Sequence, residues 1–510
     1  MARTPGVRAA RLGLKEDVML PILVGHSYFL RLDPKQLERA KPYPPLATLQ
    51  VAASLREAGH EVTLFDAMLA QGVTEYAAAL RTSRAQVVIL YEDNFNFLTK
   101  MCLAAMRAAC CQMIAAARRS GARVIVAGSD ATDAPEVYLR AGADVALMGE
   151  GLGALAALVQ RLDADRHLGA VQLTQGLAGL AYRDGEELRR VSEARIPSLI
   201  AYPELPAWDL VDIERYRAVW LKAHGFFSLN MAASRGCPFR CNWCAKPIWG
   251  NQYAQRSPES AAAEFVHLKR EFNPDHIWFA DDIFGFRPAW VKRFAQLVRE
   301  AGALVPFTIQ IRADLMSEAM TAALREAGCA EAWIGAESGS QRILDAMNKG
   351  ATVAEILTAR ARLKAHGIRV GFFIQLGYLD EQLTDILATR DLLQAAQPDD
   401  VGVSVAYPLP GTKFYEHVKQ DLVEKSHWQD SGDLAMMFRG TYTSDFYRAI
   451  RDLLHEQVSL PTLAAPQHGD AYHRARGALE RRWLELLSRE RQYRSADSDA
   501  AALQARLRCT

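Results

Sequence analysis

The stretch SRGCPFRCNWCAKPIWG, residues 234–250, decides how the middle of this chain of 510 residues is interpreted. It places three cysteines in the pattern Cys-x-x-x-Cys-x-x-Cys, at Cys237, Cys241 and Cys244. Thiolates this close together are typical ligands of a soft metal site. An iron–sulfur cubane ordinarily takes four cysteines, so three would leave one iron open to a small molecule. A structural zinc site is the alternative, but it needs four protein ligands, and the next twenty residues contain no Cys or His.

Strand-like runs alternate with helical stretches on both sides of this loop, which predicts parallel βα units. Six units in about 190 residues are too few for a closed eight-stranded barrel, so we predict a partial (β/α)6 barrel over 222–415, with its active face where strands end. Ser257 and Pro258 should begin the helix that follows the cysteine loop. The predicted strands lie at 226–234, 276–282, 307–312, 331–337, 369–377 and 401–408.

The N-terminal segment 18–190 shows the same alternation and ends in a predicted hairpin that turns at Asp184 and Gly185. It predicts an α/β fold with a doubly wound parallel sheet, Rossmann-like or flavodoxin-like, whose ligands bind outside the carboxyl ends of the strands. A Pro-containing linker should occupy 191–221, and a mostly helical C-terminal region should occupy 416–510. The predicted strands lie at 18–25, 61–67, 85–93, 123–130 and 144–151.

Composition excludes several classes of protein. The chain is 50% hydrophobic, which excludes a disordered protein, and its net charge of +1 argues against a general nucleic-acid binder. It has no membrane-span-length apolar run and no signal-peptide core, so we expect a cytoplasmic protein without a membrane span. Four cysteines outside the cysteine loop should pack as small hydrophobes; these are Cys102, Cys110, Cys111 and Cys329.

The cysteine pattern, with Trp243 before its last cysteine and a six-unit barrel around it, resembles the radical S-adenosylmethionine (radical SAM) enzymes. The resemblance implies a 4Fe-4S cluster whose open iron binds S-adenosylmethionine and cleaves it to a 5′-deoxyadenosyl radical, with electrons from an external donor such as flavodoxin or ferredoxin. It extends over 311–350 and implies that Trp243, Arg312, Glu337 and Ser338 bind S-adenosylmethionine. A surface ion pair with Arg312 or a lysine is the alternative role for Glu337.

Two other features of the barrel concern the loops after its second and fifth strands. Asp281 and Asp282 could face the cavity or cap the following helix. The family's Gly-x-Pro-Gly-Glu-Thr after the fifth strand is replaced by a different sequence beginning at Gly377.

The N-terminal segment is similar to the cobalamin-binding domain fused to many radical SAM enzymes. The similarity rests on YPPLA at 43–47, on GSDATDAPE at 128–136 and on MGEG at 148–151. Asp-x-His-x-x-Gly is absent, so no histidine cobalt ligand is implied, and we expect a surface role for His26. A sheet of this kind without cobalamin is the alternative. The implied cobalamin-binding residues are Gly128, Ser129, Asp130, Gly149, Glu150 and Gly151.

Together the two resemblances imply a cobalamin-dependent radical SAM enzyme that methylates an unactivated carbon of a small-molecule substrate. The first alternative is a radical oxidative cyclase that resembles the anaerobic magnesium-protoporphyrin monomethyl ester cyclase. The second is a cobalamin or iron–sulfur binding module without catalysis. The substrate is not readable from the sequence, and His427, Trp428 and Tyr442 are expected to pack in the interior.

Overall fold

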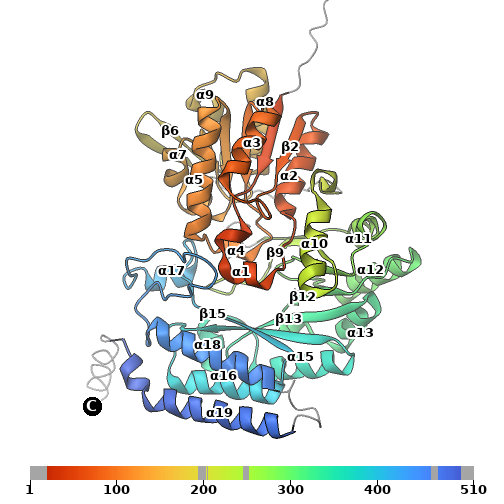
Figure 1. Cartoon of the computed structure of the whole chain (residues 1–510), viewed down its shortest axis with the longest axis vertical. Helices are drawn as coiled ribbons and strands as arrows, with labels where there is room; N and C mark the ends of the chain where they lie inside the picture. Colours follow the sequence, from red (N-terminus) through yellow and green to blue (C-terminus); the bar gives the residue numbers. More distant parts are fainter. Residues whose placement is uncertain (1–19, 193–202, 204, 245–251, 461–468, 496–510) are drawn as a thin grey trace, which may run out of the picture.

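A computed structural model of the chain describes residues 20–192, 203, 205–244, 252–460 and 469–495. Two β-sheets follow one another along the long axis of the molecule, the N-terminal sheet above and the second sheet below, with the C-terminal helices at the far end (Figure 1). Both sheets are predominantly parallel, which confirms the predicted fold class.

The N-terminal sheet has seven strands in the order β2-β1-β3-β4-β5-β6-β7. The first five strands are parallel, and β6 and β7 form the antiparallel hairpin predicted at Asp184 and Gly185. The strand order reverses direction beside β1, which is the ligand-binding position of such sheets. The strands are β1 (Pro21–Gly25), β2 (Glu61–Phe65), β3 (Val87–Tyr91), β4 (Arg123–Ala127), β5 (Val145–Leu147), β6 (Leu180–Asp184) and β7 (Glu187–Val191).

Helices cover both faces of this sheet because its central strands are apolar on both sides. Along β3, Val87 and Ile89 belong to one buried cluster and Val88 and Leu90 to another. The second cluster includes Tyr76 from α3, whereas α2 and α8 contribute to the first. The helices are α1 (Pro34–Arg39), α2 (Leu46–Glu57), α3 (Val73–Ser83), α4 (Phe97–Lys100), α5 (Ala104–Arg119), α6 (Ser129–Asp133), α7 (Pro135–Arg140), α8 (Leu152–Ala164) and α9 (Ala170–Thr174).

The chain around Cys102 forms two helices, α4 and α5, separated by a break. Helix α4 ends at Lys100, Cys102 adopts a left-handed backbone conformation with φ of 54°, and α5 begins at Ala104. The Ala104 N–H donates to the carbonyl of Trp428 at 2.8 Å, so a distant segment takes a donor at the start of α5. A tertiary contact therefore accompanies a break that local periodicity does not show.

The second sheet has six parallel strands in the order β15-β14-β13-β12-β11-β8 and curls into a half-barrel, as predicted. A short antiparallel hairpin, β9 (Ser234–Gly236) with β10 (Tyr253–Gln255), was not predicted; it flanks the cysteine loop. The six strands are β8 (Ser228–Met231), β11 (His276–Phe279), β12 (Phe307–Ile311), β13 (Cys329–Glu337), β14 (Arg369–Leu376) and β15 (Asp400–Val405).

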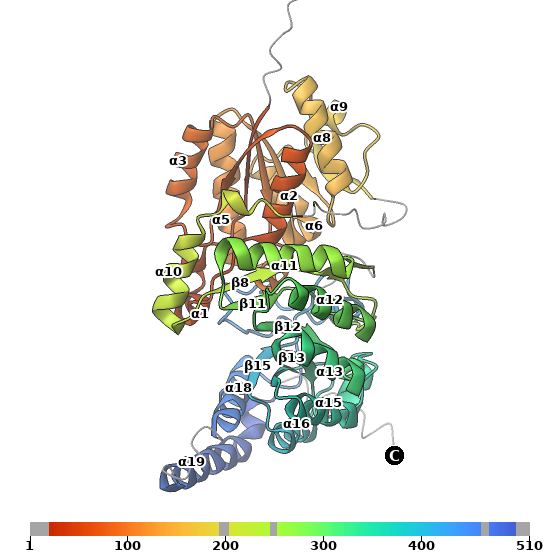
Figure 2. The ribbon, with the colours of Figure 1, turned by 90° about the vertical axis from the view of Figure 1, so that its right-hand side faces the viewer.

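Helices pack on the convex side of the half-barrel around buried rings such as Phe265 and Phe279 (Figure 2). Helix α11 begins as predicted, because the Ser257 hydroxyl accepts the N–H of Ser260 and Pro258 is its first residue. The helices are α10 (Ile213–His224), α11 (Pro258–Phe272), α12 (Pro288–Glu300), α13 (Glu318–Ala327), α14 (Gln341–Ala346), α15 (Val353–Ala365) and α16 (Leu383–Ala396).

The C-terminal region contains α17 (Lys413–Val418), α18 (Ser444–Ser459) and α19 (Gly469–Ser488). Between α17 and α18, residues 419–443 form no helix, and this stretch reaches the N-terminal domain, where the Ser431 hydroxyl donates to Asp33 at 2.7 Å. The helical prediction therefore holds only for part of this region. The described residues contain no helix long and apolar enough to cross a bilayer.

Candidate active site

The cysteine loop follows β9 at the carboxyl edge of the half-barrel. Cys237 is buried, and Cys241 and Cys244 are half-buried. Residues 245–251 lie outside the described residues. The described part of the loop therefore presents its three thiols within a partly sheltered environment at the predicted active face.

Asn242 fixes this loop to two other segments. Its backbone N–H donates to the carbonyl of Met347 at 3.1 Å, and its side-chain amide donates to the carbonyl of Ala346 at 2.7 Å. Its side-chain oxygen accepts the hydroxyl of Tyr378 at 2.8 Å. Tyr378 follows Gly377 in the segment that departs from the family sequence, so the departure supplies a support for the loop.

Arg312 places a positive charge beside the cysteines. Its Nη1 lies 3.6 Å from Cys241 Sγ, and its guanidinium carbon lies 3.8 Å from the centroid of the Phe239 ring. Burial lowers the pKa of Arg312, but Asp314 and the thiolates of Cys241 and Cys237 outweigh burial and raise it overall. A neighbouring guanidinium favours the thiolate form, which is the form that binds metal.

A second cation, Lys349, was not predicted. Its Nζ lies 2.6 Å from Glu337 Oε1 at the end of β13 and 6.0 Å from the centroid of the Trp243 ring. Burial lowers the pKa of Lys349, but Glu337 and Cys241 outweigh burial and raise it overall. No metal-ligand or catalytic motif contains this lysine, so the sequence carried no signal for it.

The Glu337–Lys349 pair is closely enclosed. A Cβ at Gly335 would lie 2.5 Å from Glu337 Oε1 and 2.6 Å from Lys349 Nζ, so a larger residue there would displace the ends of both side chains. Glu337 itself has a φ of 59°, a left-handed conformation that costs energy for a residue with a side chain. An amino-acid ligand carries one ammonium and one carboxylate, so it could exchange partners with this ion pair without leaving a charge unpaired.

The other two residues implied for S-adenosylmethionine differ in their surroundings. The Ser338 hydroxyl lies 3.1 Å from the Thr389 hydroxyl of α16 and accepts the Ser340 N–H at 3.1 Å, so it is engaged within the fold. The indole nitrogen of Trp243 is buried and has no hydrogen-bond partner among the described residues. A bound ligand could therefore use the indole N–H more readily than the Ser338 hydroxyl.

The cysteine loop fits an iron–sulfur cluster better than a single metal ion. Among the described residues no three His, Cys, Asp or Glu side chains converge on one ion. In a cubane each cysteine binds a different iron, so the three sulfurs need not converge. Cys329 is buried at the start of β13, outside the loop. The three loop thiols, with Arg312 beside them, match a cluster with one open iron.

Neither aspartate after β11 caps the following helix, whose N-cap is Arg287. Asp281 is fully buried, and its carboxylate accepts the Ala233 N–H at 3.0 Å and the Ser234 hydroxyl at 2.5 Å, which fixes the start of β9. Burial raises the pKa of Asp281 to about 7. Asp282 forms an ion pair at 2.6 Å with Lys100 of α4, in the N-terminal domain.

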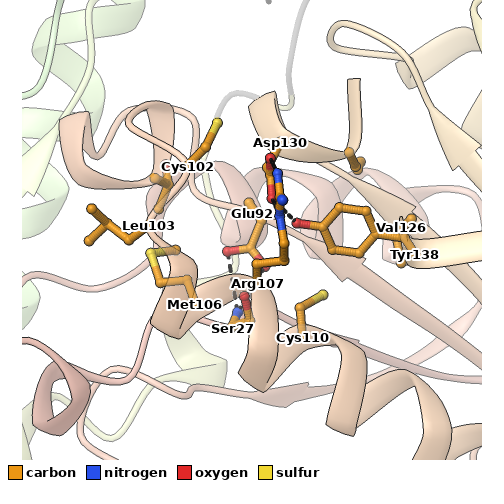
Figure 3. A pocket seen from close by; sticks show the side chains of 13 residues that line it. Ser27, Glu92, Cys102, Leu103, Met106, Arg107, Cys110, Val126, Asp130 and Tyr138 are labelled. Carbon is orange, nitrogen blue, oxygen red and sulfur yellow. Dashed lines mark hydrogen bonds and ion pairs between the residues drawn. The ribbon is translucent and has the colours of Figure 1, made fainter. Parts of the chain in front are cut away.

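A cavity in the N-terminal domain lies at the carboxyl ends of β1, β3 and β4 (Figure 3). Arg107 binds the Asp130 carboxylate at 2.6 Å, and the Tyr138 hydroxyl donates to the same carboxylate at 2.5 Å. The Glu92 carboxylate accepts the Ser27 N–H at 3.0 Å and the Ser27 hydroxyl at 2.6 Å. Burial raises the pKa of Glu92. The cavity thus presents carboxylate, hydroxyl and guanidinium groups.

One of the two predicted glycine turns, at Gly128, adjoins the cavity lining. Gly128 has a φ of 148°, and a Cβ there would lie 2.8 Å from the Glu92 side chain. Gly149 donates its N–H to the Thr132 hydroxyl at 3.0 Å, and a Cβ at Gly151 would lie 2.8 Å from Leu147. Ser129 is half-buried and begins α6.

Groups of this kind can bind the amide side chains that a corrinoid carries on its rim. The polar groups of the cavity can donate to and accept from amides, and the glycines permit close approach of the backbone. Asn94, in the loop after β3, is fully buried, and both polar atoms of its side chain lack partners among the described residues. An unpaired buried amide costs about 1–3 kcal/mol.

His26 is buried, so the surface role expected from the sequence is wrong. Its Nε2 lies 3.0 Å from Asp66 Oδ1 and 3.0 Å from the N–H of Ala67. Burial lowers the pKa of His26, but Asp66 outweighs burial and raises it overall. Asp66 also accepts the Tyr216 hydroxyl at 2.5 Å, which connects the first domain to α10.

The carboxyl edges of the two sheets face each other where α4 and β9 meet (Figure 1). Lys100 binds Asp282 across this junction. Glu150, from the turn after β5, forms an ion pair with Arg235 of β9. The loops that follow strands in both sheets are therefore in direct contact, and the cysteine loop lies beside the turn predicted to bind cobalamin.

Two family models match this chain. Residues 231–393 match the Radical SAM superfamily, and residues 37–159 match the B12 binding domain. The first match covers the cysteine loop and most of the half-barrel, and the second covers the cavity and its glycine turns. The implied cofactors are a 4Fe-4S cluster, S-adenosylmethionine and cobalamin.

Curated relatives and solved structures agree with these matches. An uncharacterized methyltransferase of Pyrococcus horikoshii is 26% identical over 391 residues, covering 76% of this chain and 81% of that protein. The anaerobic magnesium-protoporphyrin IX monomethyl ester cyclase of Cereibacter sphaeroides is 26% identical over 287 residues, covering 55% of this chain and 45% of that protein.

Two solved structures share the fold. The radical S-adenosylmethionine methyltransferase TsrM of Kitasatospora setae, with tryptophan and a SAM analogue bound, has a TM-score of 0.61 at 18% identity and covers 78% of this chain and 76% of its own. The cobalamin-dependent S-adenosylmethionine radical enzyme OxsB has a TM-score of 0.66 at 16% identity and covers 92% of this chain and 72% of its own.

Proposed function

We propose that this chain, a radical SAM enzyme with an N-terminal B12-binding domain, methylates an unactivated carbon of a small-molecule substrate. When bound, the cluster and S-adenosylmethionine would supply a substrate-activating radical, and cobalamin would supply methyl transfer. The observation that carries the proposal is the contact between the carboxyl edges of the two sheets. It brings the cysteine loop and the cobalamin-type turn together through Glu150 and Arg235.

The residues of the half-barrel have distinct parts in this proposal. Cys237, Cys241 and Cys244 would hold the cluster, and Arg312 would balance the negative charge of the thiolates. Lys349 and Glu337 would receive the carboxylate and the ammonium of S-adenosylmethionine, since they are already a matched buried pair. Trp243 would donate its indole N–H to the same ligand.

The N-terminal domain would hold the corrinoid over this site. Of the predicted residues, Asp130 lines the cavity and Gly128 and Ser129 lie between the lining residues Ala127 and Asp130. Arg107 and Tyr138 hold the Asp130 carboxylate. Because the two domains pack together through buried residues, they would also exclude water from the space between the cofactors. A radical generated there would then meet only its intended target.

The test is anaerobic reconstitution of the full chain with iron, sulfide and hydroxocobalamin, followed by S-adenosylmethionine labelled in its methyl group. With a reductant, we expect 5′-deoxyadenosine, and we expect S-adenosylhomocysteine formation together with loss of label from S-adenosylmethionine. Production of 5′-deoxyadenosine without any S-adenosylhomocysteine, across a panel of candidate substrates, would contradict methyl transfer.

A radical oxidative cyclase is the second candidate, because the magnesium-protoporphyrin cyclases match more than half of this chain. It would form 5′-deoxyadenosine and no S-adenosylhomocysteine, so the same experiment separates the two. The need for an external electron donor such as flavodoxin or ferredoxin, the absence of nucleic-acid partners and a cytoplasmic location stay predictions.

A further inference from the structure

One buried ion pair connects the cysteine loop to the Gly-Glu-Gly turn of the B12-binding domain. Arg235 lies on β9, two residues before Cys237, and its guanidinium binds the Glu150 carboxylate. The two side chains are 8% and 9% exposed. Glu150 lies between Gly149 and Gly151. Because its carboxylate binds Arg235, this carboxylate lies at the domain junction.

Each partner is held firmly within its own domain. The Glu150 carbonyl accepts the Tyr91 hydroxyl at 2.8 Å at the end of β3, and the preceding Gly149 is fixed by Thr132. On the other side, Arg235 is paired with Ala254 in the β9–β10 hairpin. If the Gly-Glu-Gly turn moves, either the β9–β10 hairpin moves with it or the ion pair breaks.

Breaking the pair is unfavourable because both charges are buried. Removing one partner of a buried ion pair is strongly destabilising, because it leaves the other charge buried and uncompensated. Movement of one domain edge should accordingly be transmitted to the other rather than absorbed.

We propose that the Arg235–Glu150 pair couples corrinoid occupancy of the B12-binding domain to the geometry of the cysteine loop. Arg235 is then a positioning residue for the cluster, and Glu150 acts through Arg235 instead of contacting the corrinoid. This inference rests on the proposed function only in requiring that both groups bind. Coupling of two sites is reciprocal, so the cluster should strengthen corrinoid binding by the same factor as the corrinoid strengthens cluster binding.

The test measures hydroxocobalamin affinity of the full chain by absorbance titration, with and without the reconstituted cluster. Coupling free energies of this kind give about 5- to 150-fold changes in affinity, and we expect a factor in that range for the unaltered chain. In the variants Glu150→Gln and Arg235→Gln, the cluster and hydroxocobalamin should each still bind alone. The cluster should then no longer change the hydroxocobalamin affinity, so the coupling factor should fall to one. The electron paramagnetic resonance spectrum of the reduced cluster should respond to hydroxocobalamin only in the unaltered chain.

The matched control is Asp282→Asn, which breaks the Lys100 pair across the same junction without touching either loop. This variant should leave unchanged the factor by which the cluster strengthens hydroxocobalamin binding. The charge-reversed double variant Glu150→Arg/Arg235→Glu should restore coupling. The inference is overturned if Arg235→Gln keeps the full factor, if Asp282→Asn removes it equally, or if the unaltered chain binds both groups independently. Failure of the unaltered chain to bind either group would instead overturn the proposed function.

Discussion

The two facing carboxyl edges solve different binding problems with different side chains. The edge of the half-barrel places the cations Arg312 and Lys349 beside cysteines, with each cation also paired to a carboxylate. The edge of the N-terminal sheet gathers the carboxylates Glu92 and Asp130, with Arg107 as the neighbouring cation. The edge of the half-barrel is suited to bind metal through thiolates. The edge of the N-terminal sheet is suited to bind a large ring with uncharged amide side chains through many weak contacts.

This difference shows why the two sites are recognised with unequal ease. Metal ligation needs a few particular atoms, and one loop supplies all three thiols. A macrocycle needs a shaped surface, and the cavity here is lined by segments that follow β1, β3 and β4. The following changes test the contrast, starting with the largest expected effect.

Replacing Cys241 with alanine should abolish the half-barrel site and spare the other edge. Iron content should fall to background, and formation of 5′-deoxyadenosine should fall by more than the 10- to 100-fold that is typical of changes around metal ligands. Hydroxocobalamin should still bind to the variant. The control is Cys111→Ala in α5, which should retain iron. Equal loss of iron in both variants would contradict the assignment.

Replacing Lys349 with methionine should destabilise the cluster-free chain by about 3–5 kcal/mol, because the Glu337 charge loses its buried partner. The double variant Lys349→Met/Glu337→Leu should recover much of this loss. Denaturant unfolding of the three proteins at pH 7 measures the effect. A single variant as stable as the original chain would show that the pair is less buried than its surroundings indicate.

Glu381, in the turn after β14, should make stability depend on pH. Burial raises its pKa to about 8, so the folded state keeps a proton that the unfolded state has released. Stability should therefore be greatest below about pH 4.5 and should fall towards pH 8, by about 1.4 kcal/mol per pH unit from this group. Glu381→Gln, which can still accept the Gly377 N–H, should flatten this part of the profile. Denaturant unfolding measures the free energy of unfolding of both proteins between pH 5 and 8. The same pH dependence in the original chain and in Glu381→Gln would exclude this effect.

Replacing Arg107 with glutamine should produce the smallest effect, confined to the N-terminal edge. The loss of charged hydrogen bonds to Asp130 should weaken hydroxocobalamin binding about tenfold, since such bonds contribute about 1.5–3 kcal/mol. Iron content should not change. Arg56→Gln removes an exposed ion pair with Asp209 and serves as the control. Unaltered affinity in an absorbance titration would remove Arg107 from the binding surface.

Local sequence patterns were enough to predict the strands of both sheets. Apolar runs of the right length, separated by amphipathic helices, predicted all six strands of the half-barrel and the five parallel strands of the first sheet. They did not predict the β9–β10 hairpin or the break before α5. The hairpin strands have only three residues each, and the break coincides with a contact to Trp428, more than 300 residues away.

The sequence by itself determined the three cysteines of the loop and the presence of two parallel sheets, because both follow from the spacing of residues that are close together in the chain. Only the tertiary structure decided which charges meet. It paired Lys349 with Glu337, enclosed His26 with Asp66, and turned Glu150 away from the cavity toward Arg235. Ion pairs form between whichever residues folding brings together, and their energies depend on burial, which no local pattern records.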